Sequence, residues 1–100
     1  MTCAASDTAP AAGPVLATVP VLASLDLDES AAFYADRLGF TPRLRTGDYL
    51  IVERDGCELH FWHCAERHIA EKTSCYVRGD ARELYVIDPH GNLLKFGEST

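Results

Sequence analysis

The feature that most constrains the fold is a pair of apolar stretches joined by the turn sequence Asp-Pro-His-Gly-Asn at 88–92. Leu84, Val86 and the β-branched Ile87 predict a first strand, and residues 93–96 predict a second one. Proline fixes its own φ, while glycine and asparagine tolerate positive φ, so the intervening sequence favours a tight turn. The stretch therefore predicts a β-hairpin.

The first half of the chain predicts one helix among four strands. Leu50 and Val52 alternate with Tyr49, Ile51 and Glu53, which favours a strand at 49–54. Asp55-Gly56 is a strong two-residue hairpin signal. Strands are expected at 17–24, 41–45, 49–54 and 57–64.

The helix is expected at residues 29–38. Asp26 or Asp28 can cap its start, and Glu29 suits its first turn. Gly39 is expected to end it in the left-handed conformation. The resulting order, β-α-β-β-β, predicts an α+β class.

The second half predicts strands but no full helix. Residues 66–72 form a polar connector with room for one helical turn, and a strand is expected from 74 to 77. Residues 1–13 are rich in Ala, Ser, Thr and Pro and predict a flexible leader. The interpretation is one domain at 14–100, made of a first module at 15–64 and a second at 73–98.

Composition limits the function classes. One hundred residues make one small domain with a thin core, which dimerisation would stabilise. A net charge of -6 argues against a nucleic-acid partner and favours cationic small molecules. There is no apolar run long enough for a membrane helix and no secretory signal pattern, so a cytoplasmic location is expected. In that reducing compartment the four cysteines, Cys3, Cys57, Cys64 and Cys75, are expected to be small buried apolar residues.

Two motifs together resemble a known family. The helix sequence with Phe33-Tyr34 and Leu38-Gly39-Phe40, followed later by the 88–92 turn, is similar to the bleomycin-resistance branch of the glyoxalase/bleomycin-resistance/dioxygenase (vicinal oxygen chelate) superfamily. The resemblance implies two β-α-β-β-β modules with glyoxalase-like sheets, and a homodimer in which the modules are exchanged between chains.

The second module is incomplete against that pattern. Only five residues, 78–82, separate Val77 from Glu83, where the family carries a further helix and strand. The sequence leaves open whether the protein is shortened here or a segment is missing from the sequence. Either way, the missing helix is expected to leave one sheet face uncovered.

The same resemblance bears on metal binding. Enzymes of the superfamily hold a divalent metal with His and Glu side chains, and the corresponding positions here include Val19, Ser74 and Lys95. Valine has no donor atom, and an ammonium group repels a cation. His60 and His63 point to opposite faces of a strand and cannot chelate one ion. We therefore expect no metal, no cofactor and no catalytic residue, with the histidines exposed or partly buried.

A ligand-binding site is expected from the aromatic residues. Tyr49 matches a family position that stacks on the planar bithiazole of bleomycin, and Trp62 lies beside His60 on the return strand. Flat aromatic faces near carboxylates suit a planar cation. The predicted ligand-binding residues are Tyr49, Trp62, His60, Leu44 and Glu58.

Three functions follow for testing. The favoured one is an antibiotic-resistance protein that sequesters a cationic glycopeptide of the bleomycin type in a dimer groove, without chemistry. The alternative is a metal-dependent enzyme of the superfamily, such as a lyase, isomerase, dioxygenase or thiol transferase. The third is an interaction module that dimerises and binds no small molecule.

Overall fold

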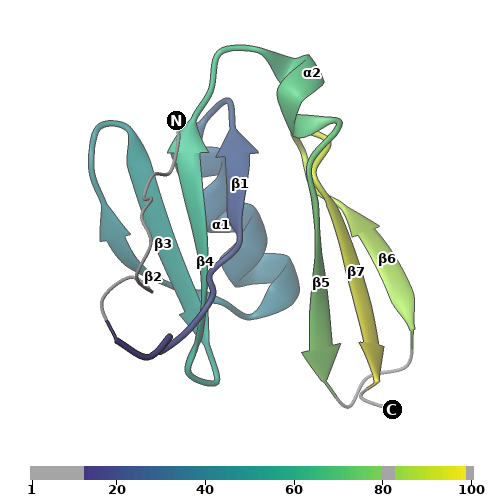
Figure 1. Ribbon diagram of the computed structural model, residues 1–100. Coiled ribbons are helices and arrows are strands. Elements are labelled where there is room, and N and C mark those ends of the chain that lie inside the picture. Colours follow the sequence, from purple (N-terminus) through teal and green to yellow (C-terminus); the bar gives the residue numbers. More distant parts are fainter. Residues whose placement is uncertain (1–12, 80–82, 99–100) are drawn as a thin grey trace, which may run out of the picture.

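A computed structural model describes residues 13–79 and 83–98, which form two β-sheets with one long helix packed against both (Figure 1). The elements in chain order are β1 (Val21–Ser24), α1 (Leu27–Leu38), β2 (Thr41–Arg45), β3 (Tyr49–Arg54), β4 (Cys57–His63), α2 (Arg67–Ala70), β5 (Ser74–Gly79), β6 (Leu84–Ile87) and β7 (Leu93–Glu98). The α+β class predicted from the sequence is confirmed.

Sheet A has the strand order β1-β4-β3-β2. β1 runs parallel to β4, and the other pairs are antiparallel. Successive side chains of a strand point to opposite faces. Leu50 and Val52 of β3 and Leu59 and Phe61 of β4 are buried on the face that α1 covers. The opposite face of sheet A therefore carries the odd-numbered residues of β3 and the even-numbered residues of β4.

The helix α1 has caps at both ends. Asp26, rather than Asp28, is the N-cap: its carboxylate accepts a hydrogen bond from the Glu29 backbone N–H at 3.1 Å. At the other end Gly39 adopts a φ of 77° and donates its N–H back to the last turn. The helix begins two residues earlier than the sequence predicted, because the cap lies at Asp26.

Sheet B has the order β5-β7-β6 and repeats part of sheet A. β5 is parallel to β7 and β6 is antiparallel to β7, which is the arrangement of β1, β3 and β4 in the first module. No counterpart of α1 or β2 occurs among the second-module residues that the structure describes, and only residues 80–82 lie outside it between Gly79 and Glu83. The described part of the second module thus contains three strands, β5, β6 and β7.

The core joins the two sheets through α1. Tyr34 is fully buried, with its ring 4.7 Å from that of Phe61 in β4. Leu94 of β7 belongs to the same core, and Val77 and Phe96 pack at its margin. The helix α1 therefore packs against both sheets.

The boundaries of β1 and β5 differ from the predicted ones. β1 begins only at Val21, because Pro20 has no N–H to donate, although its carbonyl accepts the N–H of His60 at 3.1 Å. β5 extends to Gly79, beyond the predicted end at Val77. The connector at 66–72 does contain one helical turn, α2.

Two expectations on composition can be compared with the structure. Cys64 is buried and Cys75 half-buried, but Cys57 is exposed because it begins β4 after the Asp55-Gly56 turn. Cys3 and most of the predicted leader lie outside the described residues. No helix in the described part of the chain is long and apolar enough to cross a membrane.

Candidate functional site

All five predicted ligand-binding residues lie on one face of sheet A, the face opposite α1. Glu58, His60 and Trp62 alternate along β4, and Tyr49 starts β3 directly opposite Trp62. Leu44 of β2 pairs with Ile51, which lies on this face next to Tyr49. We call this surface the open face; its members are Leu44, Tyr49, Ile51, Glu58, His60 and Trp62.

The apolar part of the open face is accessible. Trp62 is 40% exposed and Leu44 is 46% exposed, while Tyr49 is half-buried. Cross-strand neighbours have Cβ atoms about 4.5–5.5 Å apart. Tyr49 and Trp62 are thus neighbours on one patch of surface, which could accept a planar group.

The polar part of the open face is a hydrogen-bonded chain. Tyr49 Oη lies 2.8 Å from Nδ1 of His60, and Nε2 of His60 lies 2.8 Å from Oε1 of Glu58. The rings of Tyr49 and His60 meet edge to face, with centroids 5.3 Å apart. The structure therefore brings three predicted site residues into one connected unit.

Arg43 is a member of this site that the sequence reasoning missed. Its Nη1 lies 3.0 Å from Oε2 of Glu58, and its Nε lies 3.4 Å from Oε1 of Glu53. The register of β2 shifts between Pro42 and Leu44, and this irregularity sets where Arg43 falls along β3. The carboxylate of Glu58 is thereby held by His60 on one side and by Arg43 on the other.

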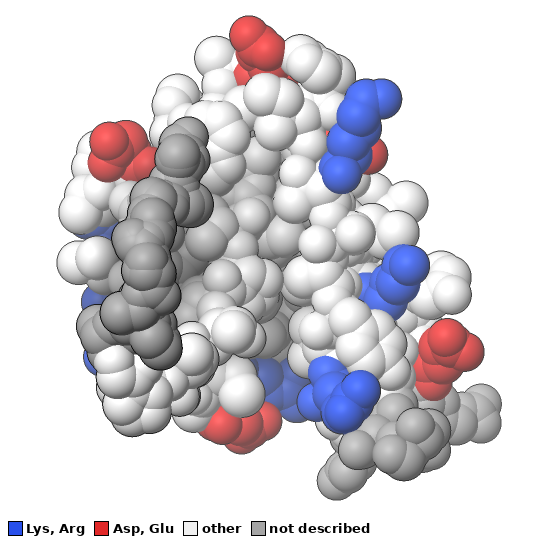
Figure 2. Space-filling model, in the orientation of Figure 1, with Lys and Arg blue, Asp and Glu red and all other residues white. Residues whose placement is uncertain are grey.

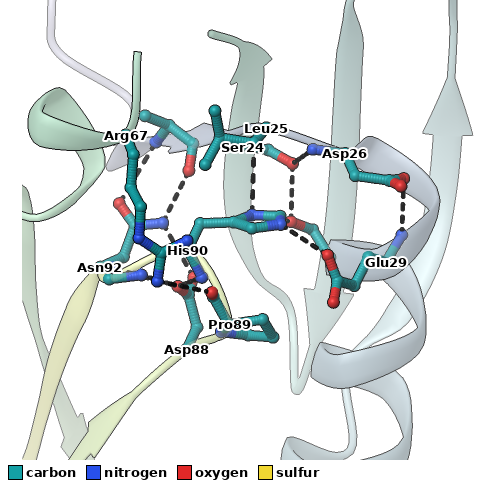
Figure 3. A network of polar contacts seen from close by, with 12 residues as sticks. Ser24, Leu25, Asp26, Glu29, Arg67, Asp88, Pro89, His90 and Asn92 are labelled. Atoms are coloured by element: carbon teal, nitrogen blue, oxygen red, sulfur yellow. Dashed lines mark hydrogen bonds and ion pairs between the residues drawn. The ribbon is translucent and has the colours of Figure 1, made fainter. Parts of the chain in front are cut away.

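A second polar cluster centres on the 88–92 turn (Figure 3). Oδ1 of Asp88 accepts three backbone N–H groups, those of His90, Gly91 and Asn92, at 2.9–3.0 Å. Oδ2 of Asp88 accepts the hydroxyl of Tyr34 at 2.7 Å and the Asn92 amide at 2.8 Å. One carboxylate thus holds the turn and anchors it to α1.

Asn92 and His90 join this turn to the first module (Figure 3). The Asn92 amide donates to the Ala23 carbonyl at 2.7 Å and accepts the Ala23 N–H at 3.3 Å, as a neighbouring strand would. His90 Nδ1 accepts the Leu25 N–H at 3.3 Å, and Nε2 lies 2.8 Å from Glu29. The expectation that the histidines are exposed or partly buried is wrong for His90, which is buried because the β1–α1 junction closes over the turn.

Burial changes the acidity of two groups next to this cluster. Burial raises the pKa of the Tyr34 hydroxyl strongly, and the negative charge of Asp88 adds to the effect. Burial also raises the pKa of the Cys75 thiol. Both groups therefore stay protonated in the folded protein at neutral pH.

The three positions compared above with metal ligands of the resembled enzymes lie on three different segments. Val19 precedes β1, Ser74 begins β5, and Lys95 lies in the centre of β7 between Tyr76 and Tyr85. Among residues 13–79 and 83–98, no group of three or more His, Cys, Asp or Glu side chains is arranged to hold a metal ion.

The surface of sheet B differs from the open face in charge. Lys95 and Arg78 are exposed on it, together with Tyr76 and Tyr85. Figure 2 shows several Lys and Arg side chains on the sheet B side of the molecule, together with Asp and Glu side chains. The two sheets therefore present surfaces of different character, aromatic with carboxylates on sheet A and aromatic with cations on sheet B.

Two cavities lie between the start of β4 and β5. One, of about 540 Å³, is lined by Glu58 and Leu59 of β4 and by Tyr76, Val77 and Arg78 of β5, among other residues. The other, of about 310 Å³, is lined by Arg54, Val77 and Phe96, among other residues. In the first module α1 covers this side of the sheet, whereas the described part of the second module has no such helix. Neither cavity includes Tyr49, His60, Trp62 or Leu44.

Comparison with known proteins identifies the fold. No family model matches the chain, and no curated protein matches its sequence. Among solved structures, the bleomycin-binding protein of bleomycin-producing Streptomyces verticillus, complexed with copper(II)-bleomycin, superposes with a TM-score of 0.81 at 22% identity, over 89% of this chain and 100% of that one.

Two further structures show the range of the likeness. A bleomycin resistance determinant encoded on transposon Tn5 gives a TM-score of 0.73 at 23% identity, over 86% of this chain and 100% of that one. A lactoylglutathione lyase from Agrobacterium tumefaciens gives 0.68 at 18% identity, over 86% and 95%. The chain has the fold of the bleomycin-binding proteins and of the wider glyoxalase/bleomycin resistance/dioxygenase group.

Proposed function

We propose that this protein sequesters cationic glycopeptides of the bleomycin type on the open face of sheet A, in a groove between two copies of the chain and without chemical turnover. The observation that carries the proposal is the pair formed by Trp62 and Tyr49. The two residues are direct cross-strand partners, and Trp62 is 40% exposed. A planar group that stacks on such a pair gains about 0.5–1.5 kcal/mol for each aromatic contact beyond the area it buries.

The charge around the aromatic pair supports a cationic ligand. Glu53 and Glu58 share the one guanidinium of Arg43, which leaves a local excess of negative charge. The whole chain carries a net charge of -6. Such a field attracts a cation and speeds its association at low ionic strength.

The similar structures support the same ligand class. Two of them are described as a protein complexed with copper(II)-bleomycin and as a bleomycin resistance determinant. The lactoylglutathione lyase shares the fold as well, so the choice between binding and catalysis rests on the residues of this chain. The open face of this protein offers aromatic surface for stacking, and its polar side chains Tyr49, His60 and Glu58 are hydrogen-bonded to one another. Both features suit binding.

A second copy of the chain would complete the site. Sheet A presents Val21, Leu44 and Trp62 as large, substantially exposed apolar side chains. One sheet face forms only one wall, whereas ligand sites bury most of their ligand. A partner laid against the open face would supply the second wall and cover this apolar surface.

Calorimetric titration with metal-free and copper-loaded bleomycin tests the ligand. We expect saturable heat with one or both forms, and no heat at tens of micromolar protein would contradict the proposal. Sedimentation equilibrium tests whether the protein forms the dimer that the groove requires, and we expect a mass of two chains. Elemental analysis of the purified protein separates the alternative: one tightly held divalent ion per chain would favour a metal-dependent enzyme.

A further inference from the structure

The hydrogen bonds that link Glu58, His60 and Tyr49 on the open face determine whether the Tyr49 hydroxyl can donate a hydrogen bond to a ligand or accept one from it. Glu58 is a carboxylate and can only accept, so Nε2 of His60, 2.8 Å from its Oε1, carries the hydrogen of that bond. In a neutral imidazole the other nitrogen is then a bare acceptor. Nδ1 of His60 lies 2.8 Å from Tyr49 Oη, so the Tyr49 hydroxyl donates its only hydrogen to Nδ1.

We infer that Glu58, acting through His60, holds Tyr49 as a pure hydrogen-bond acceptor, so that the open face selects cations that carry N–H donors at the point where they meet Tyr49. This inference rests on the proposed function, because it names the ligand chemistry of the same surface. The lone pairs of Tyr49 Oη are left for the ligand, and no hydrogen remains to be offered.

The residues around Glu58 and His60 support this direction of the hydrogen bonds. The second carboxylate oxygen of Glu58 is held by Arg43 at 3.0 Å, which fixes the orientation of the carboxylate. The residues paired with His60 on the adjacent strands, Val21 of β1 and Ile51 of β3, are apolar and offer no competing partner. The side chain of His60 is only 18% exposed, so water has limited access to either nitrogen.

The assignment changes the role predicted for Glu58. The sequence suggested that this carboxylate contacts the ligand directly, but both of its oxygens are engaged by the protein. Glu58 and His60 are positioning residues, and Tyr49 is the group that would contact the ligand. A hydrogen bond from a charged donor to Tyr49 corresponds to roughly tenfold in affinity or more.

Two matched probes test the inference. One is a bithiazole with a guanidinium tail, and the other is the same molecule with every guanidinium N–H replaced by N-methyl. We expect wild-type protein to bind the first about tenfold more tightly. Tyr49→Phe should abolish this ratio, and Glu58→Gln should reduce it, because a glutamine can donate to Nε2 and allow the reverse arrangement of hydrogens.

Glu53→Gln is the matched control. Glu53 lies directly opposite Glu58, and its carboxylate pairs with the same Arg43, but it does not touch His60. This variant removes the same charge and should keep the probe ratio. Equal losses in Glu53→Gln and Glu58→Gln, or a ratio retained in Tyr49→Phe, would overturn the inference.

Nitrogen NMR of the imidazole gives a readout that needs no ligand. We expect His60 in the wild-type protein to carry its hydrogen on Nε2, and a hydrogen on Nδ1 would overturn the inference. If the NMR result is as expected but neither probe nor bleomycin binds, the proposed function fails while the hydrogen-bond assignment stands.

Discussion

The hydroxyl of Tyr34 donates a hydrogen bond of 2.7 Å to Oδ2 of Asp88, which joins the centre of α1 to the turn between β6 and β7. Tyr34 is completely buried, and Asp88 is nearly so. The same carboxylate organises its own turn through three backbone N–H groups. The Asp88 carboxylate therefore links the two modules, alongside the contacts of Asn92 and His90 with the first module.

Removing the Tyr34 hydroxyl should weaken this junction. In Tyr34→Phe the Asp88 carboxylate loses one of its donors inside the core, so we expect the free energy of unfolding to fall by about 1–3 kcal/mol in urea titration. Tyr85→Phe is the control, because Tyr85 is 63% exposed. Equal stability of the two variants would contradict the structural role of the Tyr34–Asp88 contact.

The stability of the protein should decline in alkali. Burial raises the pKa of Tyr34 above its ordinary value of 10.0 and that of Cys75 above its ordinary value of 9.0. The unfolded chain releases these protons near the ordinary values while the folded chain retains them, so the unfolded state binds fewer protons. The stability is fully present below about pH 9 and is lost above it, by up to about 1.4 kcal/mol per pH unit for Tyr34.

Urea midpoints measured on either side of pH 10 check this dependence. Tyr34→Phe should show a shallower loss of stability above about pH 10 than the wild type, because its side chain has no proton to retain. Tyr85→Phe should keep the wild-type slope. Parallel slopes in Tyr34→Phe and the wild type would mean that Tyr34 ionises as readily in the folded chain as in the unfolded one.

Gly91 should tolerate no side chain. Its φ is 106°, and a Cβ atom there would lie 2.5 Å from Cγ of Glu71 and 3.1 Å from its Cα. We expect Gly91→Ala to destabilise the fold by about 1–3 kcal/mol from the backbone conformation alone. Gly47→Ala is the control, because nothing lies within 4 Å of a Cβ at that position. Thermal unfolding of both variants measures the difference, and a Gly91→Ala protein as stable as Gly47→Ala would refute it.

The local sequence was sufficient to predict the structure wherever residues close together in the chain determine it. Asp55 and Gly56 both have positive φ, 55° and 80°, as their hairpin turn requires. The strand alternation placed Tyr49, His60 and Trp62 together, because side chains two residues apart on β4 share a face and Tyr49 is paired with Trp62. The open face could therefore be predicted as a set of residues.

The remainder depends on contacts that are distant in sequence. The position of Arg43 follows from a register shift between β2 and β3, which no local signal marks. His90 lies in a polar turn whose sequence predicts exposure. It is buried by residues that are 60 or more positions away in the sequence. Whether Glu58 faces a ligand or a protein group likewise required the positions of both His60 and Arg43.

Trp62 should dominate ligand affinity on the open face. It combines the largest exposed aromatic surface there with a direct cross-strand tyrosine neighbour, and tryptophan is enriched among residues that dominate binding energy. We expect Trp62→Ala to weaken bleomycin binding by about 2 kcal/mol, roughly 30-fold in Kd, in calorimetric titration. His63→Ala is the control, because His63 is an exposed neighbour on the same strand whose side chain points to the other face. Sedimentation of both variants separates a ligand contact from a loss of dimer, and unchanged affinity in Trp62→Ala would place the binding site elsewhere on the molecule.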